Sequence, residues 1–398
     1  MHLRKALLHL TLFLLLAGLR LKAAEREKIF PVMPWNNIPN DRDAIARIKE
    51  CGFTVAGFVS PATLDTCRKA GIKAIVSDPR ISNHDWTHFD VNTARADAIR
   101  ALDAVRKNPA LYGYYLRDEP GADCFPGLAA MASLVQQETP GKWAYVNLFP
   151  NYASSGQLSD ASYEDYLEKF VTTCHPTQLS YDHYALMDNG SLGGEYWNNL
   201  EQMRAVAVKH HLPFWNIVLA CAHFSFREPS AADLRFEVYS SLAYGARGIA
   251  YFTYFAPQVG NYRAAAIDQF GHPTPTWSHL QNINLQIQKL APTLLDLTSD
   301  DTYHFGSIPA GCHGPGTNSL VTGASGNFAV GEFTHADGSR YVMVVNKDLA
   351  KSTSCWPQFR HPPKTLKFVS PYTGKLEVFD GEQVWLAPGQ GVLLKPEP

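Results

Sequence analysis

Two adjacent carboxylates end an apolar, strand-like segment in the stretch LYGYYLRDEPG, residues 111–121. Asp118 and Glu119 are followed by Pro120, which lacks the amide hydrogen that further strand pairing needs, and by Gly121, which allows a turn. Two neighbouring carboxylates are costly to remove from water. We therefore expect them either in a solvated turn or at the mouth of a site.

Side chains alternate along a strand, and this alternation divides the segment into two faces. The faces are Tyr115, Arg117 and Glu119 on one side and Tyr114, Leu116 and Asp118 on the other. The second face begins with apolar residues and suits a layer of helices. The pattern therefore predicts that Arg117 and Glu119 point into the site and that Asp118 points away from it. A purely structural ion pair between Arg117 and Glu119 is the alternative.

A second acid follows another strand-like run, QLSYDHYAL, residues 178–186, in which Asp182 shares a face with Ser180 and Tyr184. Cleavage of a glycosidic bond uses two acids: one protonates the leaving oxygen, and the other acts as a nucleophile or as a base for water. We expect Glu119 to be the general acid, with a pKa raised by partial burial, and Asp182 to be its partner. A loop-capping role for Asp182 is the alternative.

Other polar and aromatic residues close the strand-like runs and are candidates for substrate binding. They are Trp35, Asp78, Arg117, Asp118, Asn147, His183, Tyr184, His223, Glu228 and Tyr254. The aromatic rings among them, together with Trp197, could stack on sugar rings, although packing in the core is the alternative for each ring. Asp78 and Glu228 are reserve candidates for the second acid, and Glu228 could instead be a charge at a helix start.

The sequence indicates no cofactor and no metal site. His183 and His223 lack the H-x-x-x-H spacing or the clustered carboxylates of a metal centre, so hydrogen bonding is the better interpretation of both. No GxSxG, GxxxxGK[ST] or phosphate-cradling glycine-rich loop occurs.

The elements that position these residues alternate regularly over residues 28–298. Apolar, β-branched and aromatic runs of strand length are each followed by a helical pattern, and this unit occurs eight times. Such alternation predicts an α/β fold, a closed (β/α)8 TIM barrel with its site at the carboxyl ends of the strands. An open doubly wound sheet is the alternative, but no GxGxxG follows the first strand.

The last part of the chain, residues 300–398, has a different sequence pattern. It shows short strand-like runs separated by the turn signals ADG, YTG, DG and PGQG, without a helical period. This pattern predicts a C-terminal all-β sandwich module packed on the barrel.

The first 24 residues are predicted to be a signal peptide. MHLRK is a basic start, ALLHLTLFLLLAGL is an apolar run, and RLKAAE is a plausible cleavage zone. Arg20 and Lys22 leave an uncleaved anchor as an alternative, and no lipobox cysteine follows the run. We expect a secreted or periplasmic protein without stable membrane insertion after cleavage.

The net charge bears on the possible partners, and the cysteines bear on disulfides and zinc sites. The net charge of −2 does not suggest a nucleic-acid partner. The seven cysteines show no paired or zinc-type spacing, and their positions assign no disulfide. The sequence leaves the oligomeric state undecided.

Three segments together resemble glycoside hydrolases of the clan A barrel superfamily, closest to the family 42 beta-galactosidase-like group. They are GYYLRDEPG, YGARGIAYFTY and the terminal VWLAPGQGVLLK. The resemblance implies that Glu119 is the acid/base. It also implies a nucleophilic acid after the seventh strand, where this chain has NIVLACAHF, so Asp182 or Glu228 would have to replace it. SYDHY faintly resembles the Tyr-Asp pair of family 18, in which the substrate's acetamide is the nucleophile.

These observations favour an exported glycoside hydrolase that cleaves an oligo- or polysaccharide. The missing acid after strand seven supports an alternative, a non-catalytic carbohydrate-binding protein on a degenerate barrel. A third possibility is a glycan lyase, for which Tyr184 and His183 would supply a base.

Overall fold

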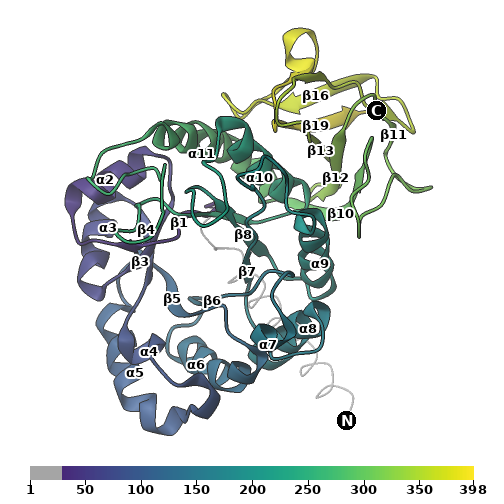
Figure 1. Cartoon of the computed structure of the whole chain (residues 1–398). Coiled ribbons are helices and arrows are strands. Elements are labelled where there is room, and N and C mark those ends of the chain that lie inside the picture. Colours follow the sequence, from purple (N-terminus) through teal and green to yellow (C-terminus); the bar gives the residue numbers. More distant parts are fainter. Residues whose placement is uncertain (1–28) are drawn as a thin grey trace, which may run out of the picture.

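The computed structural model describes residues 29–398 of the chain (Figure 1). The predicted signal peptide, residues 1–24, lies outside the described residues. None of the helices between residues 29 and 398 combines the length and the hydrophobicity that a membrane span needs.

Parallel strands occupy the centre of the first part of the chain (Figure 1). Several are buried along their whole length, as expected for strands covered on both faces. The strands are β1 (Val32–Pro34), β2 (Asn37–Ile38), β3 (Val55–Val59), β4 (Lys73–Val76), β5 (Leu111–Asp118), β6 (Trp143–Asn147), β7 (Leu179–Asp182), β8 (Phe214–Leu219) and β9 (Gly248–Phe252).

The strands form two parallel sheets, in the orders β1-β9-β8-β7 and β2-β3-β4-β5-β6. At one seam, the Thr54 amide donates to the Val32 carbonyl at 3.0 Å. At the other seam, the Leu148 amide donates to the Ser180 carbonyl at 2.8 Å. Hydrogen bonds therefore cross both seams between the sheets.

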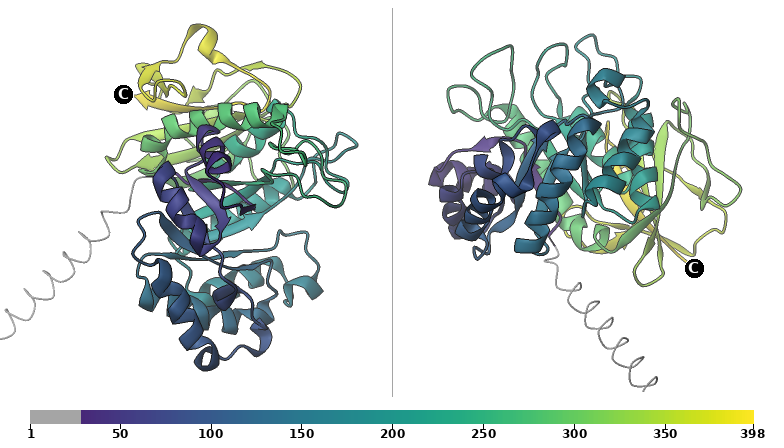
Figure 2. Two further views of the ribbon diagram at one scale, coloured as in Figure 1. Left: turned by 90° about the vertical axis from the view of Figure 1, so that its left-hand side faces the viewer. Right: turned by 90° about the horizontal axis from the view of Figure 1, so that it is seen from below.

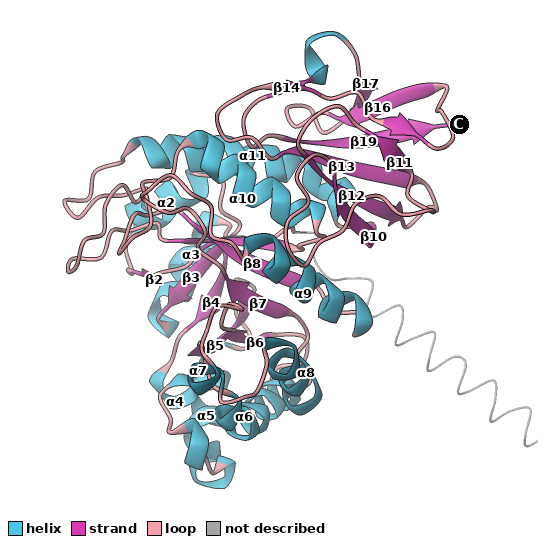
Figure 3. Cartoon of the chain, turned by 45° about the vertical axis from the view of Figure 1, so that its right-hand side comes forward, coloured by secondary structure: helices cyan, strands magenta, loops and turns pink. Residues whose placement is uncertain are grey.

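A layer of helices surrounds the strands (Figures 1 and 3). Local caps help to set where these helices begin: Asp41 accepts from the Ala44 amide at 2.7 Å, and Ser230 and Asp233 form a capping box. The helices are α2 (Arg42–Glu50), α3 (Leu64–Ala70), α4 (Pro79–Ser82), α5 (Val91–Val105), α6 (Phe125–Glu138), α7 (Ser155–Leu158), α8 (Tyr163–Cys174), α9 (Tyr196–Lys209), α10 (Ala231–Ala243) and α11 (Pro275–Leu294).

Two apolar layers hold this arrangement together. Side chains inside the ring of strands form one cluster, in which the Trp143 and Trp215 rings meet at 4.7 Å between centroids. A larger cluster fills the space between strands and helices. The predicted parallel order of an α/β barrel-like fold is thus confirmed, whereas full closure of the barrel stays a prediction.

The C-terminal module is all-β, as predicted, and contains one main antiparallel sheet, whereas its description as a sandwich stays a prediction. The order of this sheet is β10-β12-β13-β19-β16-β17, and two short strand pairs, β11-β15 and β14-β18, accompany it. The strands are β10 (Leu297–His304), β11 (Val321–Gly323), β12 (Phe328–His335), β13 (Arg340–Asn346), β14 (Thr353–Ser354), β15 (Gln358–Phe359), β16 (Thr365–Val369), β17 (Leu376–Val378), β18 (Trp385–Leu386) and β19 (Gly391–Glu397).

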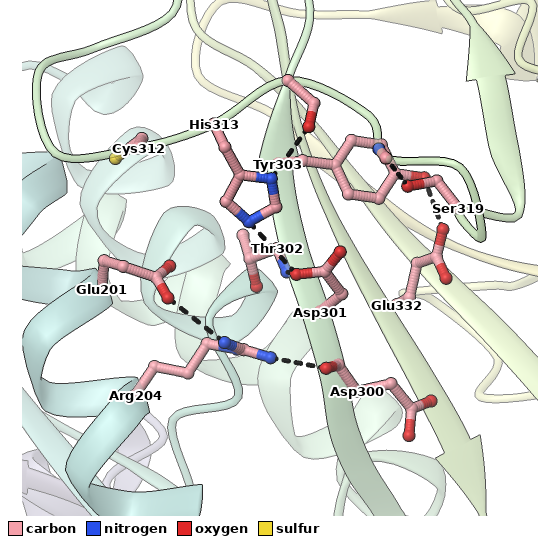
Figure 4. Close-up of polar contacts among 12 residues, drawn as sticks. Glu201, Arg204, Asp300, Asp301, Thr302, Tyr303, Cys312, His313, Ser319 and Glu332 are labelled. Atoms are coloured by element: carbon pink, nitrogen blue, oxygen red, sulfur yellow. Dashed lines mark hydrogen bonds and ion pairs between the residues drawn. The ribbon is translucent and has the colours of Figure 1, made fainter.

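Helix α10 packs on one face of the main sheet, and the opposite face carries a separate apolar cluster that includes Val321 of β11 and Leu386 of β18. A Cβ atom on Gly331 of β12 would lie 1.9 Å from the carbonyl oxygen of Ala243 in α10, so only glycine allows this close approach. The module is also joined to α9, where the Arg204 guanidinium donates to the Ser299 hydroxyl at 3.0 Å. The same guanidinium donates to the Asp300 carbonyl at 2.7 Å (Figure 4). The sheet therefore packs directly on the helical layer.

Candidate active site

The carboxyl end of β5 carries the two adjacent acids, and its faces differ in part from the prediction. Tyr114 and Leu116 pack in the outer cluster and Tyr115 in the inner one, as expected. However, the pairing of β5 with β6 shifts register between Tyr115 and Arg117. Such a bulge redirects the side chains that follow it. Asp118 consequently faces inward, which corrects the expectation that it points away from the site.

Asn147, at the end of β6, connects the acids of two strands. Its side-chain amide nitrogen donates to Asp118 at 3.0 Å and to Asp182, the last residue of β7, at 2.7 Å. Because both carboxylates accept from one nitrogen, their bonded oxygens lie within about 6 Å of each other. The structure thus brings Asp118, Asn147 and Asp182 together.

A buried chain of hydrogen bonds orients the Asn147 amide. The Trp35 indole donates to the Tyr145 hydroxyl at 3.1 Å, and this hydroxyl lies 3.0 Å from the Ser180 hydroxyl. Ser180 donates in turn to the Asn147 carbonyl oxygen at 3.1 Å. Since the amide oxygen is occupied by Ser180, the amide nitrogen must face the carboxylates. Trp35 therefore acts on the site through this chain, while stacking of its ring on a sugar stays a prediction.

Glu119 lies directly after β5 in a strained backbone conformation. Its φ of +42° falls in the left-handed region, which is unfavourable for a residue with a side chain. Its amide donates to the Asn147 carbonyl at 2.9 Å, and the next carbonyl, of Pro120, accepts from the Tyr166 hydroxyl at 2.8 Å. These bonds hold the turn at the end of the strand, and strained residues of this kind cluster at functional sites.

The three acids of this site influence one another electrostatically. Burial, followed by the charge of Asp118, raises the pKa of Glu119 to about 7. Burial raises the pKa of Asp118 as well. Burial and the charges of Glu119 and Asp118 hold the pKa of Asp182 well above its usual range. Asp182, which is only 4% exposed, is therefore the acid that most readily keeps its proton.

An aromatic wall borders the acids on the side of β7 and β8. The Tyr184 ring lies 5.4 Å from the His223 ring and 5.5 Å from the Phe252 ring. His223 is buried, and its Nδ1 lies 2.9 Å from the Cys221 carbonyl. Burial, followed by the charges of Asp182 and Asp118, holds the pKa of Tyr184 well above its usual range, so Tyr184 lies near these acids. Tyr184 thus lies near the acids, and His223 adjoins Tyr184 on the side away from them.

His183 and Tyr152 border the acids on another side. His183 is buried, its Nδ1 bonds the Asn199 amide oxygen at 2.9 Å, and burial lowers its pKa to about 4, so the ring is neutral. The Tyr152 ring packs 5.0 Å from the His183 ring. Burial, followed by the charges of Asp182 and Glu119, raises the pKa of Tyr152. Tyr152 was not among the residues predicted from the strand ends. Its position in the loop after β6 was the available signal.

No protein-family model matches the chain, and no curated protein matches its sequence. Solved structures do match. A family 42 beta-galactosidase from G. stearothermophilus superposes with a TM-score of 0.64 and 8% identity, over 94% of this chain and 99% of that one. A family 5 glycoside hydrolase from Bacteroides vulgatus superposes with a TM-score of 0.60 and 12% identity, over 93% and 90%.

A further protein described as a glycoside hydrolase has a TM-score of 0.58 and 14% identity, and the match covers 93% of each chain. The chain has the fold of these glycoside hydrolases. In α/β folds built on parallel strands of this kind, sites lie at the carboxyl ends of the strands. Asp118, Asn147 and Asp182 occupy this end of three successive strands.

For two of the candidate sugar-stacking rings, the structure supports packing in the core instead. Tyr254 is fully buried, packs against Phe53, and accepts a hydrogen bond from the Trp277 indole at 3.1 Å. Trp197 is buried against Phe236 on the helical side. Neither ring is available to a sugar, because each fills the layer between strands and helices.

Three charged candidates lie outside the Asn147 network. Asp78 caps α4 and binds the Arg80 guanidinium at 2.6 Å, which lowers the pKa of Asp78. Glu228 is exposed and lies 3.4 Å from the Arg263 guanidinium. Arg117 is exposed, and within residues 29–398 it forms no ion pair with Glu119. A substrate contact by any of these three positions stays a prediction.

Replacing Asn147 by alanine is expected to lower the free energy of unfolding by about 1–3 kcal/mol, because Ser180 and Asp182 would lose a buried hydrogen-bond partner. Urea unfolding followed by circular dichroism measures the change. Asn189→Ala, which removes an amide from an exposed loop, serves as the control and should have an effect close to zero. Equal midpoints for both variants would contradict a supporting role for Asn147.

Proposed function

We propose that the protein is an exported glycoside hydrolase that cleaves an oligo- or polysaccharide, with Glu119 as the general acid. One observation carries this proposal. Glu119 combines a strained position at the end of β5 with a pKa raised to about 7 and a neighbouring carboxylate, Asp118. A general acid that works near neutral pH needs a pKa near 7, because it must hold a proton and still release it.

The roles of the other acids follow from their burial. Asp118 is less buried than Asp182 and its pKa is raised less strongly, so Asp118 is the better carrier of negative charge. We therefore assign Asp118 to stabilise the positive charge that develops on the sugar ring. Asp182, which the sequence suggested as the partner of Glu119, would instead remain protonated and position Asn147.

The pH dependence should reveal the acid. Glu119 must be protonated to donate, and its protonated fraction falls as the pH rises through its pKa of about 7. We expect kcat/KM to decline on the alkaline side with a midpoint near this value, and we expect Glu119→Gln to lose this limb. A profile of wild-type kcat/KM between pH 4 and 10 is the measurement. An alkaline limb that persists unchanged in Glu119→Gln would assign it to another group.

A non-catalytic carbohydrate-binding protein is the second candidate. The end of β8 reads Leu219, Ala220 and Cys221, all fully buried and apolar or weakly polar, with no acid among them. A barrel that had lost its second acid at this position would still bind sugars at its mouth.

A panel of natural oligo- and polysaccharides, with detection of new reducing ends, distinguishes the two candidates. We expect the purified chain to release reducing ends from at least one glycan and the Glu119→Gln variant to release far fewer. Binding without any release by the wild type would favour the second candidate. Sequencing the N-terminus of the protein recovered from the exported fraction tests cleavage near residue 24.

A further inference from the structure

Phe224, in the loop after β8, exposes its aromatic ring to solvent. Its side chain is 72% exposed, and its φ of +49° lies in the left-handed region. A bulky residue is rarely found in that region, and an exposed ring gains nothing from the core. The surrounding structure must therefore impose this position.

Asn261, in the loop after β9, holds the backbone of Phe224. Its side-chain oxygen accepts from the Phe224 amide at 2.8 Å, and its side-chain nitrogen donates to the Phe224 carbonyl at 3.1 Å. The side-chain amide of Asn261 thus pairs with both the backbone N–H and the backbone C=O of Phe224. The hydrogen bond from the Phe226 amide to the His223 carbonyl, at 2.8 Å, closes the turn that carries the ring.

The two loops are joined at further points and project from the same end of the barrel (Figure 2). Ala222 and Arg263 exchange two backbone hydrogen bonds, at 2.9 and 3.0 Å. The Arg263 guanidinium lies 3.4 Å from the Glu228 carboxylate, so these opposite charges offset each other. The loops form a braced wall, which we name the Phe224 wall and define as residues 222–228 and 261–263.

An aromatic path leads from the acids to the Phe224 wall. Tyr184, beside Asp182, contacts His223, and the His223 ring stacks on the Tyr262 ring at 5.4 Å and 15°. The Phe224 ring lies 5.4 Å from His223 and 6.4 Å from Tyr262. The rings therefore continue from the buried site to the exposed rim.

We propose that the Phe224 wall is an outer sugar-binding subsite and that the substrate is a neutral oligosaccharide that extends past the cleaved bond. This inference rests on the proposed function. The apolar face of a sugar ring packs on an aromatic ring, and a pre-positioned ring binds without the cost of ordering it. The paired charges of Arg263 and Glu228 favour an uncharged sugar over an acidic one.

Titration calorimetry with sugars of increasing length tests the subsite. The probes are cello-, manno- and β-1,4-galacto-oligosaccharides of two to six residues and the three monosaccharides, added to Glu119→Gln protein so that they stay intact. Phe224→Ala in this background should weaken the tightest-binding long oligosaccharide about tenfold and leave the monosaccharides unchanged. Phe270→Ala removes an equally exposed ring from the loop after β9 and serves as the control.

Each outcome decides between the two proposals. Unchanged affinity of Phe224→Ala at every length, equal weakening of monosaccharides, or no binding of any oligosaccharide would overturn the subsite. If the wild type hydrolyses none of the probes while Phe224→Ala still loses affinity for long ones, the subsite stands and the hydrolase fails. If the wild type hydrolyses them and Phe224→Ala keeps the same length dependence, the hydrolase stands and the subsite fails.

Discussion

Replacing Glu119 by glutamine is expected to reduce kcat/KM on a natural glycan by at least ~100-fold, the scale on which general acid catalysis contributes. Glutamine keeps the shape of the side chain but cannot supply a proton to the leaving oxygen. Substrates with a good leaving group need less protonation, so an aryl glycoside should lose less activity. Reducing-end release and aryl release, measured on the same preparations, give the two values.

Glu138→Gln provides the control for this prediction. Glu138 ends α6 and lies 3.7 Å from the Arg95 guanidinium, away from the Asn147 network, so its loss should leave both activities near the wild-type values. Calorimetric titration of Glu119→Gln with an uncleaved substrate should show retained binding. Near wild-type hydrolysis of a natural glycan by Glu119→Gln would place the acid elsewhere.

The second large effect is expected for Asp118→Asn, which should lower kcat/KM by about 10²–10³-fold. Asparagine keeps the size of the side chain but removes the charge that would face the developing positive charge on the sugar. Asp182→Asn is the matched comparison. We expect Asp182 to be neutral already. Asp182→Asn should therefore lower kcat/KM less than Asp118→Asn does.

Kinetics of the two variants on one substrate decide between the assignments. A larger loss in Asp182→Asn than in Asp118→Asn would make Asp182 the charged partner of Glu119, as the sequence alone suggested. Circular dichroism spectra should first show that both variants are folded, because both positions bond to Asn147.

Several features of the site could be predicted from sequence patterns because they depend on local chemistry. Pro120 and Gly121 end β5 at the two acids, and the alternation of apolar strands with helical patterns predicts that strand ends share one side of the molecule. The positions of Asn147 and Asp182 at strand ends follow from the same pattern. The positions of Asn147 and Asp182 at strand ends could therefore be predicted from the sequence.

Other features depended on how strands pair. The predicted faces of β5 assumed regular alternation, but the register shift between Tyr115 and Arg117 turns Asp118 inward. A bulge arises from the fit between neighbouring strands, and a single strand sequence does not reveal that fit. For the same reason, Tyr254 could not be recognised as a packing residue before Phe53 and Trp277 were seen against it.

The sequence by itself determined the order of elements, the two acids after β5 and the absence of an acid after β8, because these are properties of residue type and local periodicity. Only the tertiary structure decided which acids meet. The amide of Asn147 joins Asp118 to Asp182 across three strands, and burial then separates their pKa values. Distances and desolvation arise only when distant segments pack together, and they determine which carboxylate holds a proton and which holds a charge.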